Sequence, residues 1–141
     1  MEKLISSIEK EFGIPSGLLR AIAQVESGLK PYAVNVSKKS HYFNDKNKAE
    51  KFILARLGEG HTNISVGCLQ ILFTAHKKRF NHSVEKMLDP EKNVRYAAGL
   101  LKKLHDKYGS WGTAVQKYHS NSSKKSMAYY NKVITKLGRT I

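Results

Sequence analysis

The stretch IPSGLLRAIAQVESGLKP, residues 14–31, carries the pattern from which the fold is predicted. Pro15 and Ser16 are typical of a helix start, and Gly28 and Pro31 end the pattern. Between them the apolar residues repeat with a helical period: Leu18, Leu19, Ile22, Ala23 and Val25. The stretch therefore predicts a short helix that is mostly buried.

Glu26 breaks this apolar pattern. Apolar residues lie seven, four and three positions before it, so the stripe that faces the core ends in a carboxyl group. Burial raises the pKa of a carboxyl group because the charged form loses its hydration, and a general acid must be protonated near neutrality. Periodicity alone favours a plainer interpretation, in which Glu26 turns to solvent or pairs with Arg20 or Lys30.

Helical spacing of apolar residues continues on both sides of this stretch. It predicts further helices at residues 4–12, 49–57, 90–108, 111–118 and 130–137. Asp89 before Pro90, and Ser110, are start signals for two of them, and the polar run 119–126 is the expected loop before the last. Alternating apolar residues around the turn SKKS predict a small hairpin within residues 32–43. The predicted fold class is mainly α with a small β element.

The chain has 141 residues, with 25 Lys and Arg against 11 Asp and Glu, a formal net charge of +14. This length predicts a single domain over residues 1–141 and excludes a two-domain enzyme. Residues 1–70 hold 10 basic and 7 acidic side chains (+3), and residues 71–141 hold 15 and 4 (+11). The second half is therefore expected to attract anions.

Several features are not expected. No apolar stretch is long enough to span a bilayer. The charged amino terminus lacks the apolar core of an export signal, so if the protein is exported, we expect its signal to have been removed from this sequence. Cys68 is the single cysteine, so no intramolecular disulfide can form. The six histidines include no HExxH, which argues against zinc or another metal. Without a glycine-rich phosphate loop or a GxSxG elbow, no cofactor is expected, and nucleotide-dependent enzymes and serine hydrolases are excluded.

Two further polar signals are weaker. Gly67 and Gln70 lie in the apolar segment SVGCLQI, where a glutamine amide can donate to and accept from a sugar. A turn glycine with a glutamine that bonds to the backbone explains the same residues equally well. Tyr118 lies on the apolar stripe of its helix, a pattern that favours core packing over function.

Four segments, in this order, resemble the lytic transglycosylase domain of the soluble (SLT) type: IPSGLLRAIAQVESGLKPYAVN, NISVGCLQI, LDPEKNVRYAAGLLKKLHDKYGSWGTAVQKYHS and YYNKVI. Small transglycosylases of bacterial secretion and flagellar systems have the same domain. Because four separate motifs occur in order, the resemblance is far more specific than any one of them. It implies a lysozyme-like fold.

The resemblance places the Glu-Ser motif of the family on Glu26 and Ser27, which implies that Glu26 is the single catalytic acid. The Gly-x-x-Gln motif falls on residues 67–70, and the family uses this glutamine, Gln70, near the acetamido group of a sugar.

The Ala-x-x-x-Tyr-Asn segment implies that Tyr118 is the active-site tyrosine, with His119 in place of the usual asparagine. Tyr129 matches the late tyrosine of the family. The substrate-binding residues that the resemblance implies are thus Ser27, Gln70, Tyr118, His119 and Tyr129.

The implied activity is cleavage of the β-1,4 bond between N-acetylmuramic acid and N-acetylglucosamine in peptidoglycan. Glu26 would protonate the glycosidic oxygen, and its carboxylate would then remove the proton of the muramic 6-hydroxyl as that oxygen attacks the anomeric carbon, leaving a 1,6-anhydromuramoyl end. An intramolecular nucleophile needs no second carboxylate, whereas hydrolases commonly use two. Asp45, Glu50 and Glu59 lie outside the family motifs and are expected to be helix caps or solvated charges.

Three alternatives remain open: a goose-type lysozyme-like hydrolase on the same bond, a non-catalytic peptidoglycan-binding or secretion-assembly module, and a nucleic-acid-binding protein. Only the net charge favours the last, and no nucleic-acid-binding motif is present. The expected partners are peptidoglycan strands and a secretion, conjugation or flagellar apparatus, with no specific nucleic acid. We expect a monomer in the periplasm or cell envelope, where the positive charge attracts anionic peptidoglycan.

Overall fold

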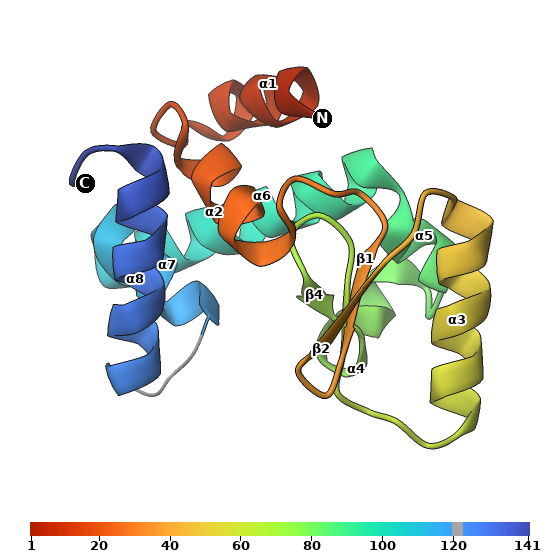
Figure 1. The fold of residues 1–141 in the computed structure, drawn as a ribbon. Coiled ribbons are helices and arrows are strands. Elements are labelled where there is room, and N and C mark those ends of the chain that lie inside the picture. Colours follow the sequence, from red (N-terminus) through yellow and green to blue (C-terminus); the bar gives the residue numbers. More distant parts are fainter. Residues whose placement is uncertain (120–122) are drawn as a thin grey trace. The chain divides into compact units, whose positions relative to one another are not determined.

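The computed structural model describes residues 1–119 and 123–141, which are mainly helical with one small antiparallel sheet (Figure 1). This arrangement confirms the predicted fold class. Among the described helices, none is both long enough and apolar enough to cross a bilayer.

The chain divides into two compact units. The first consists of residues 26–94 with Met1, and the second of residues 2–25 and 95–141. Two helices contribute residues to both units: α2 (Leu18–Ser27) and α6 (Pro90–Tyr108). The assignment of the whole chain to a single domain stays a prediction.

The first unit contains a four-stranded antiparallel sheet with the strand order β2-β1-β3-β4. Its strands are β1 (Ala33–Val36), β2 (Lys39–Tyr42), β3 (Ile64–Val66) and β4 (Ile71–Leu72). β1 and β2 confirm the predicted hairpin, in which Ala33 pairs with Tyr42. Its turn residues Ser37 (φ 49°) and Lys38 (φ 75°) are left-handed, which matches the twist of two paired strands. The sequence pattern does not predict β3 and β4, because such short strands show no clear alternation.

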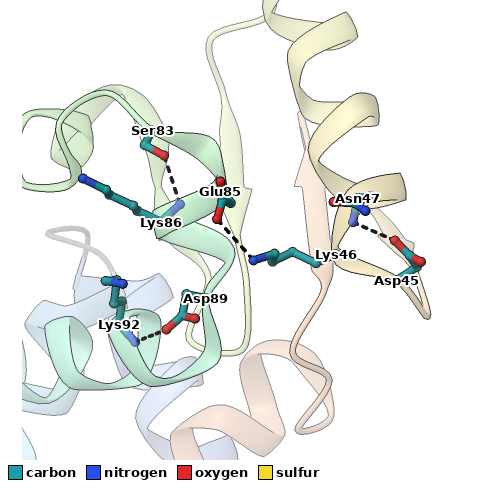
Figure 2. Close-up of polar contacts among 8 residues, drawn as sticks. All are labelled: Asp45, Lys46, Asn47, Ser83, Glu85, Lys86, Asp89 and Lys92. Atoms are coloured by element: carbon teal, nitrogen blue, oxygen red, sulfur yellow. Dashed lines mark hydrogen bonds and ion pairs between the residues drawn. The ribbon is translucent and has the colours of Figure 1, made fainter.

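The first unit also contains α3 (Lys46–Gly58), α4 (Phe73–His76), the 3₁₀ helix η1 (Lys77–Phe80) and α5 (Val84–Leu88). α3 confirms a predicted helix, and the carboxylate of Asp45 begins it by accepting hydrogen bonds from the backbone N–H groups of Asn47 (2.7 Å) and Lys48 (3.2 Å). An ion pair of 3.4 Å between Lys46 and Glu85 joins α3 to α5 (Figure 2). The other three helices are too short for the periodicity to predict.

The start of α6 is as predicted. Asp89 precedes Pro90, the first residue of α6, and its carboxylate accepts a hydrogen bond from the backbone N–H of Lys92 (3.1 Å; Figure 2). The core of the first unit is apolar, and its largest fully buried side chains are Val34, Ile53, Ile64, Leu69, Met87 and Leu88.

The second unit contains α1 (Glu2–Phe12), α7 (Trp111–His119) and α8 (Ser123–Leu137), besides its parts of α2 and α6. Ser110 caps α7 as predicted, since its hydroxyl accepts a hydrogen bond from the N–H of Thr113 (3.1 Å). The predicted loop 119–126 is wrong at both ends, because His119 ends α7 and α8 begins at Ser123. The first turn of α8 is polar and therefore lacks the apolar spacing from which a helix is predicted. Its lysines nevertheless favour helix formation. Of that predicted loop, residues 120–122 lie outside the described residues.

The start of α2 depends on a buried acid. The carboxylate of Glu9, which is 4% exposed, accepts hydrogen bonds from the N–H groups of Gly17 (3.0 Å), Leu19 (2.7 Å) and Arg20 (3.2 Å). The first N–H groups of a helix have no partner within the helix, so Glu9 stabilises the turn where α2 begins. The helix therefore starts at Leu18, a few residues later than the sequence pattern indicates.

Candidate active site

Glu26 lies in the last turn of α2 and is partly buried. Its side chain is therefore neither fully enclosed in the core nor fully exposed to solvent, the two situations that the sequence analysis considers. The sequence suggests Arg20 and Lys30 as possible ion-pair partners of Glu26, but each contacts another group. Arg20 forms an ion pair of 2.5 Å with Glu2, and the ammonium of Lys30 lies 4.2 Å from the ring centroid of Tyr42.

Ser27 links the end of α2 to the loop between β3 and β4. Its hydroxyl is buried, donates to the carbonyl of Cys68 (2.7 Å) and accepts from the N–H of Lys30 (3.2 Å). The residue after Glu26 is therefore fixed to the segment that carries Gln70. Burial raises the pKa of the Cys68 thiol to about 11.

Gln70 closes the tight turn of this loop. Its backbone N–H donates to the carbonyl of Gly67 (3.1 Å), and its side-chain Nε2 donates to the carbonyls of Gly67 (2.9 Å) and Ala33 (3.2 Å). The backbone bonding expected of a structural glutamine thus occupies its amide N–H groups. Among the described residues, no group donates to its carbonyl oxygen Oε1.

Asn93 of α6 is not among the residues predicted from the sequence, and its side chain forms hydrogen bonds to the backbone of the loop between β3 and β4. It is fully buried, its Nδ2 donates to the carbonyls of Val66 (2.9 Å) and Met87 (2.9 Å), and its Oδ1 accepts from the N–H of Leu69 (3.0 Å). A Cβ added to Gly67 would lie 2.3 Å from Nδ2 of Asn93, so only glycine fits there.

A signal for Asn93 exists in the sequence. Asn93 lies four residues before Ala97 and eight before Leu101, on the buried stripe of α6, just as Glu26 lies on the stripe of α2. A polar residue on an apolar stripe needs hydrogen-bond partners or a function.

The remaining candidate residues belong to the second unit. Tyr118 and His119 end α7, and Tyr129 lies in α8 with 4% of its surface exposed. The rings of His119 and Tyr129 stack, with centroids 4.2 Å apart and planes within 5° of parallel. Burial of part of the imidazole lowers the pKa of His119, and nearby lysines lower it further. Tyr118 is partly exposed and therefore lies outside the fully buried core that its pattern favours.

The structure thus brings Glu26, Ser27 and Gln70 together in the first unit through the Ser27–Cys68 hydrogen bond. Tyr118, His119 and Tyr129 lie in the second unit.

Comparison with known proteins agrees with the four-motif resemblance. Protein IpgF of Shigella sonnei and Protein IpgF of Shigella flexneri are each 28% identical to the chain over 117 residues, which is 82% of this chain and 64% of theirs. The chain thus covers less than two thirds of the length of these relatives. No solved structure matches it. Residues 3–134 match the family described as Transglycosylase SLT domain. Because that match covers nearly the whole chain, the protein belongs to the transglycosylase SLT domain family, for which a lysozyme-like, mainly helical fold is expected.

Proposed function

We propose that the protein is a peptidoglycan lytic transglycosylase. It cleaves the β-1,4 bond between N-acetylmuramic acid and N-acetylglucosamine and leaves 1,6-anhydromuramoyl ends. The observation that carries the proposal is the position of Glu26 at the end of α2, one residue before the Ser27–Cys68 hydrogen bond that joins this helix to the Gln70 loop.

Glu26 is the general acid and then the general base. As an acid it protonates the glycosidic oxygen, and the bond from that oxygen to the muramic anomeric carbon breaks. As a carboxylate it takes the proton of the muramic 6-hydroxyl while that oxygen bonds to the anomeric carbon. The proton that Glu26 gives to the leaving sugar is thereby replaced, and no water is consumed.

The roles of other acids in the first unit support a mechanism with one carboxylate. Asp45 caps α3, and Glu59 forms an ion pair of 2.9 Å with Arg56. The helix cap at Asp45 is one of the two roles that the sequence leads one to expect for these acids, and the carboxylate of Glu59 is engaged by Arg56. A second carboxylate is unnecessary because the attacking hydroxyl belongs to the substrate and has a high effective concentration.

The other candidate residues bind substrate in this proposal. Oε1 of Gln70 accepts a hydrogen bond from an acetamido N–H, and the backbone bonds of its Nε2 fix the direction in which Oε1 points. Ser27 positions Glu26 through the carbonyl of Cys68. Tyr118, His119 and Tyr129 contribute hydroxyl and aromatic contacts to the glycan.

We further propose that the protein acts in the cell envelope, with peptidoglycan strands as its main partner and a secretion, conjugation or flagellar apparatus as the machinery it serves. The +14 net charge supports the first part, because peptidoglycan stem peptides carry carboxylates.

The substitution Glu26→Gln tests the activity, with Glu50→Gln as the matched control because Glu50 is also a partly buried acid of the first unit. The Glu26 variant is expected to lose at least about a thousandfold in rate on purified sacculi, while the control keeps its rate. Substantial clearing of sacculi by Glu26→Gln would refute the assignment. Mass spectrometry of the released muropeptides identifies the reaction, because an anhydro product is one water lighter than the reducing product of a lysozyme-like hydrolase.

A further inference from the structure

The turn after α2 has an unusual backbone. Gly28 (φ 65°) and Leu29 (φ 67°) are both left-handed, and L residues with side chains as large as leucine rarely adopt this conformation. Such backbone outliers cluster at functional sites. The turn brings the backbone N–H of Lys30 back to the hydroxyl of Ser27, at 3.2 Å.

Lys30 and Tyr42 form an exposed pair at this turn. The ammonium of Lys30 lies 4.2 Å from the ring centroid of Tyr42, whose side chain is on the edge strand β2 and is 53% exposed. Among the described residues, no carboxylate pairs with the ammonium of Lys30. The pair is thus an unneutralised cation beside an exposed aromatic ring.

Each member of the pair is linked to the candidate site. Lys30 is four residues from Glu26 and bonded to Ser27. Tyr42 is the strand partner of Ala33, whose carbonyl accepts the side-chain amide of Gln70. The pair thus lies on two segments that hydrogen bonds link, directly or through a strand partner, to residues of the candidate site, Ser27 and Gln70.

We propose that Lys30 and Tyr42 form a binding subsite for a carboxylate of the peptidoglycan stem peptide, so that the protein favours peptide-bearing, negatively charged glycan. This inference rests on the proposed function. The ammonium of Lys30 binds the carboxylate as a point charge, and the exposed ring of Tyr42 contacts the apolar atoms beside it.

The test measures binding without catalysis. The Glu26→Gln protein is sedimented with insoluble sacculi, either native or with their carboxylates converted to amides, and the two dissociation constants are compared. Lys30→Met is then added to the Glu26→Gln protein, with Lys51→Met as the matched control, because Lys51 is an exposed lysine of α3 in the same unit. Thermal unfolding by circular dichroism checks that each variant is folded.

We expect Lys30→Met to weaken binding to native sacculi about three- to fivefold and to leave binding to amidated sacculi unchanged, as for one partly exposed charge pair. Lys30→Arg should retain the preference for native sacculi, and Tyr42→Ser should reduce it. Equal losses for Lys30→Met and Lys51→Met, or equal losses on both kinds of sacculi, would overturn the proposal. Digestion by the protein with Glu26 intact is a separate measurement, so a failure of the proposed function is distinguishable from a failure of this subsite.

Discussion

Replacing Gly67 with alanine tests how the Gly67–Gln70 loop is held. Gly67 has a φ of 84°, and an added Cβ would lie 2.3 Å from Nδ2 and 2.7 Å from Cγ of Asn93. Gly60 is a close control, because its φ is 92° and no atom lies within 4 Å of the added Cβ. The two substitutions share the backbone cost and differ in the contact.

The expected magnitudes follow from these two terms. Alanine in the left-handed region costs about 1–2 kcal/mol, which is the whole cost at Gly60. At Gly67 the side chain of Asn93 must also move, although it is fully buried and bonded to three backbone groups. A strained or broken hydrogen bond in the interior adds about 2–3 kcal/mol. We therefore expect Gly67→Ala to lower the free energy of unfolding by about 3–5 kcal/mol.

Urea unfolding followed by circular dichroism measures both variants, and a cycle with Asn93→Ala assigns the contact. Once Asn93 is alanine, the added Cβ has no amide to displace, so Gly67→Ala should cost only about 1–2 kcal/mol in that background. Equal costs for Gly67→Ala and Gly60→Ala, or a cost at Gly67 that is independent of Asn93, would refute the reasoning.

Three further predictions concern buried or partly buried groups. Glu9→Ala should lower the free energy of unfolding by about 2–4 kcal/mol in urea titrations, because it leaves the first N–H groups of α2 without their acceptor; a loss below about 1 kcal/mol would contradict this role. Because burial raises the pKa of Cys68 to about 11, an aromatic disulfide reagent at pH 7.5 should label the thiol only in denaturant, and rapid labelling of the native protein would disprove this. Since burial lowers the pKa of His119 below its usual 6.5, the unfolded chain binds more protons than the folded protein as the pH falls through 6.5, so stability should fall there. His119→Gln should reduce the difference between the melting temperatures at pH 7.5 and pH 5, and an unchanged difference would argue against this assignment.

The long helices could be predicted because their information is local. α1, α6 and α7 each combine an apolar stripe with a start or stop signal within a few residues, such as Gly13 after α1 or Ser110 before α7. The short elements could not be predicted in this way. β3, for example, pairs with β1, which lies about thirty positions earlier in the chain, and with the two-residue strand β4. Strand pairing of that kind leaves little trace in a three-residue pattern.

The candidate site shows the same division. Glu26 and the Gly67–Gln70 motif were visible in the sequence, but the hydrogen bond from Ser27 to the carbonyl of Cys68 was not. A serine hydroxyl can bond to many backbone groups, and its partner here is 41 residues away. The three bonds of Asn93 likewise end on backbone atoms, whose positions no side-chain pattern encodes.

Glu9, Asn93 and Glu26 are polar residues that lie on apolar helical stripes, and they differ in burial. Glu9 and Asn93 are 4% and 0% exposed, and the hydrogen bonds described for each join its side chain to three backbone groups. A group enclosed in this way stabilises local structure and is closed to a ligand. Glu26 has the same sequence signature, yet it is only partly buried, at a helix end whose next residue is fixed to the Gln70 loop. Periodicity thus identifies polar residues that need an explanation, and partial exposure distinguishes Glu26 from the buried Glu9 and Asn93.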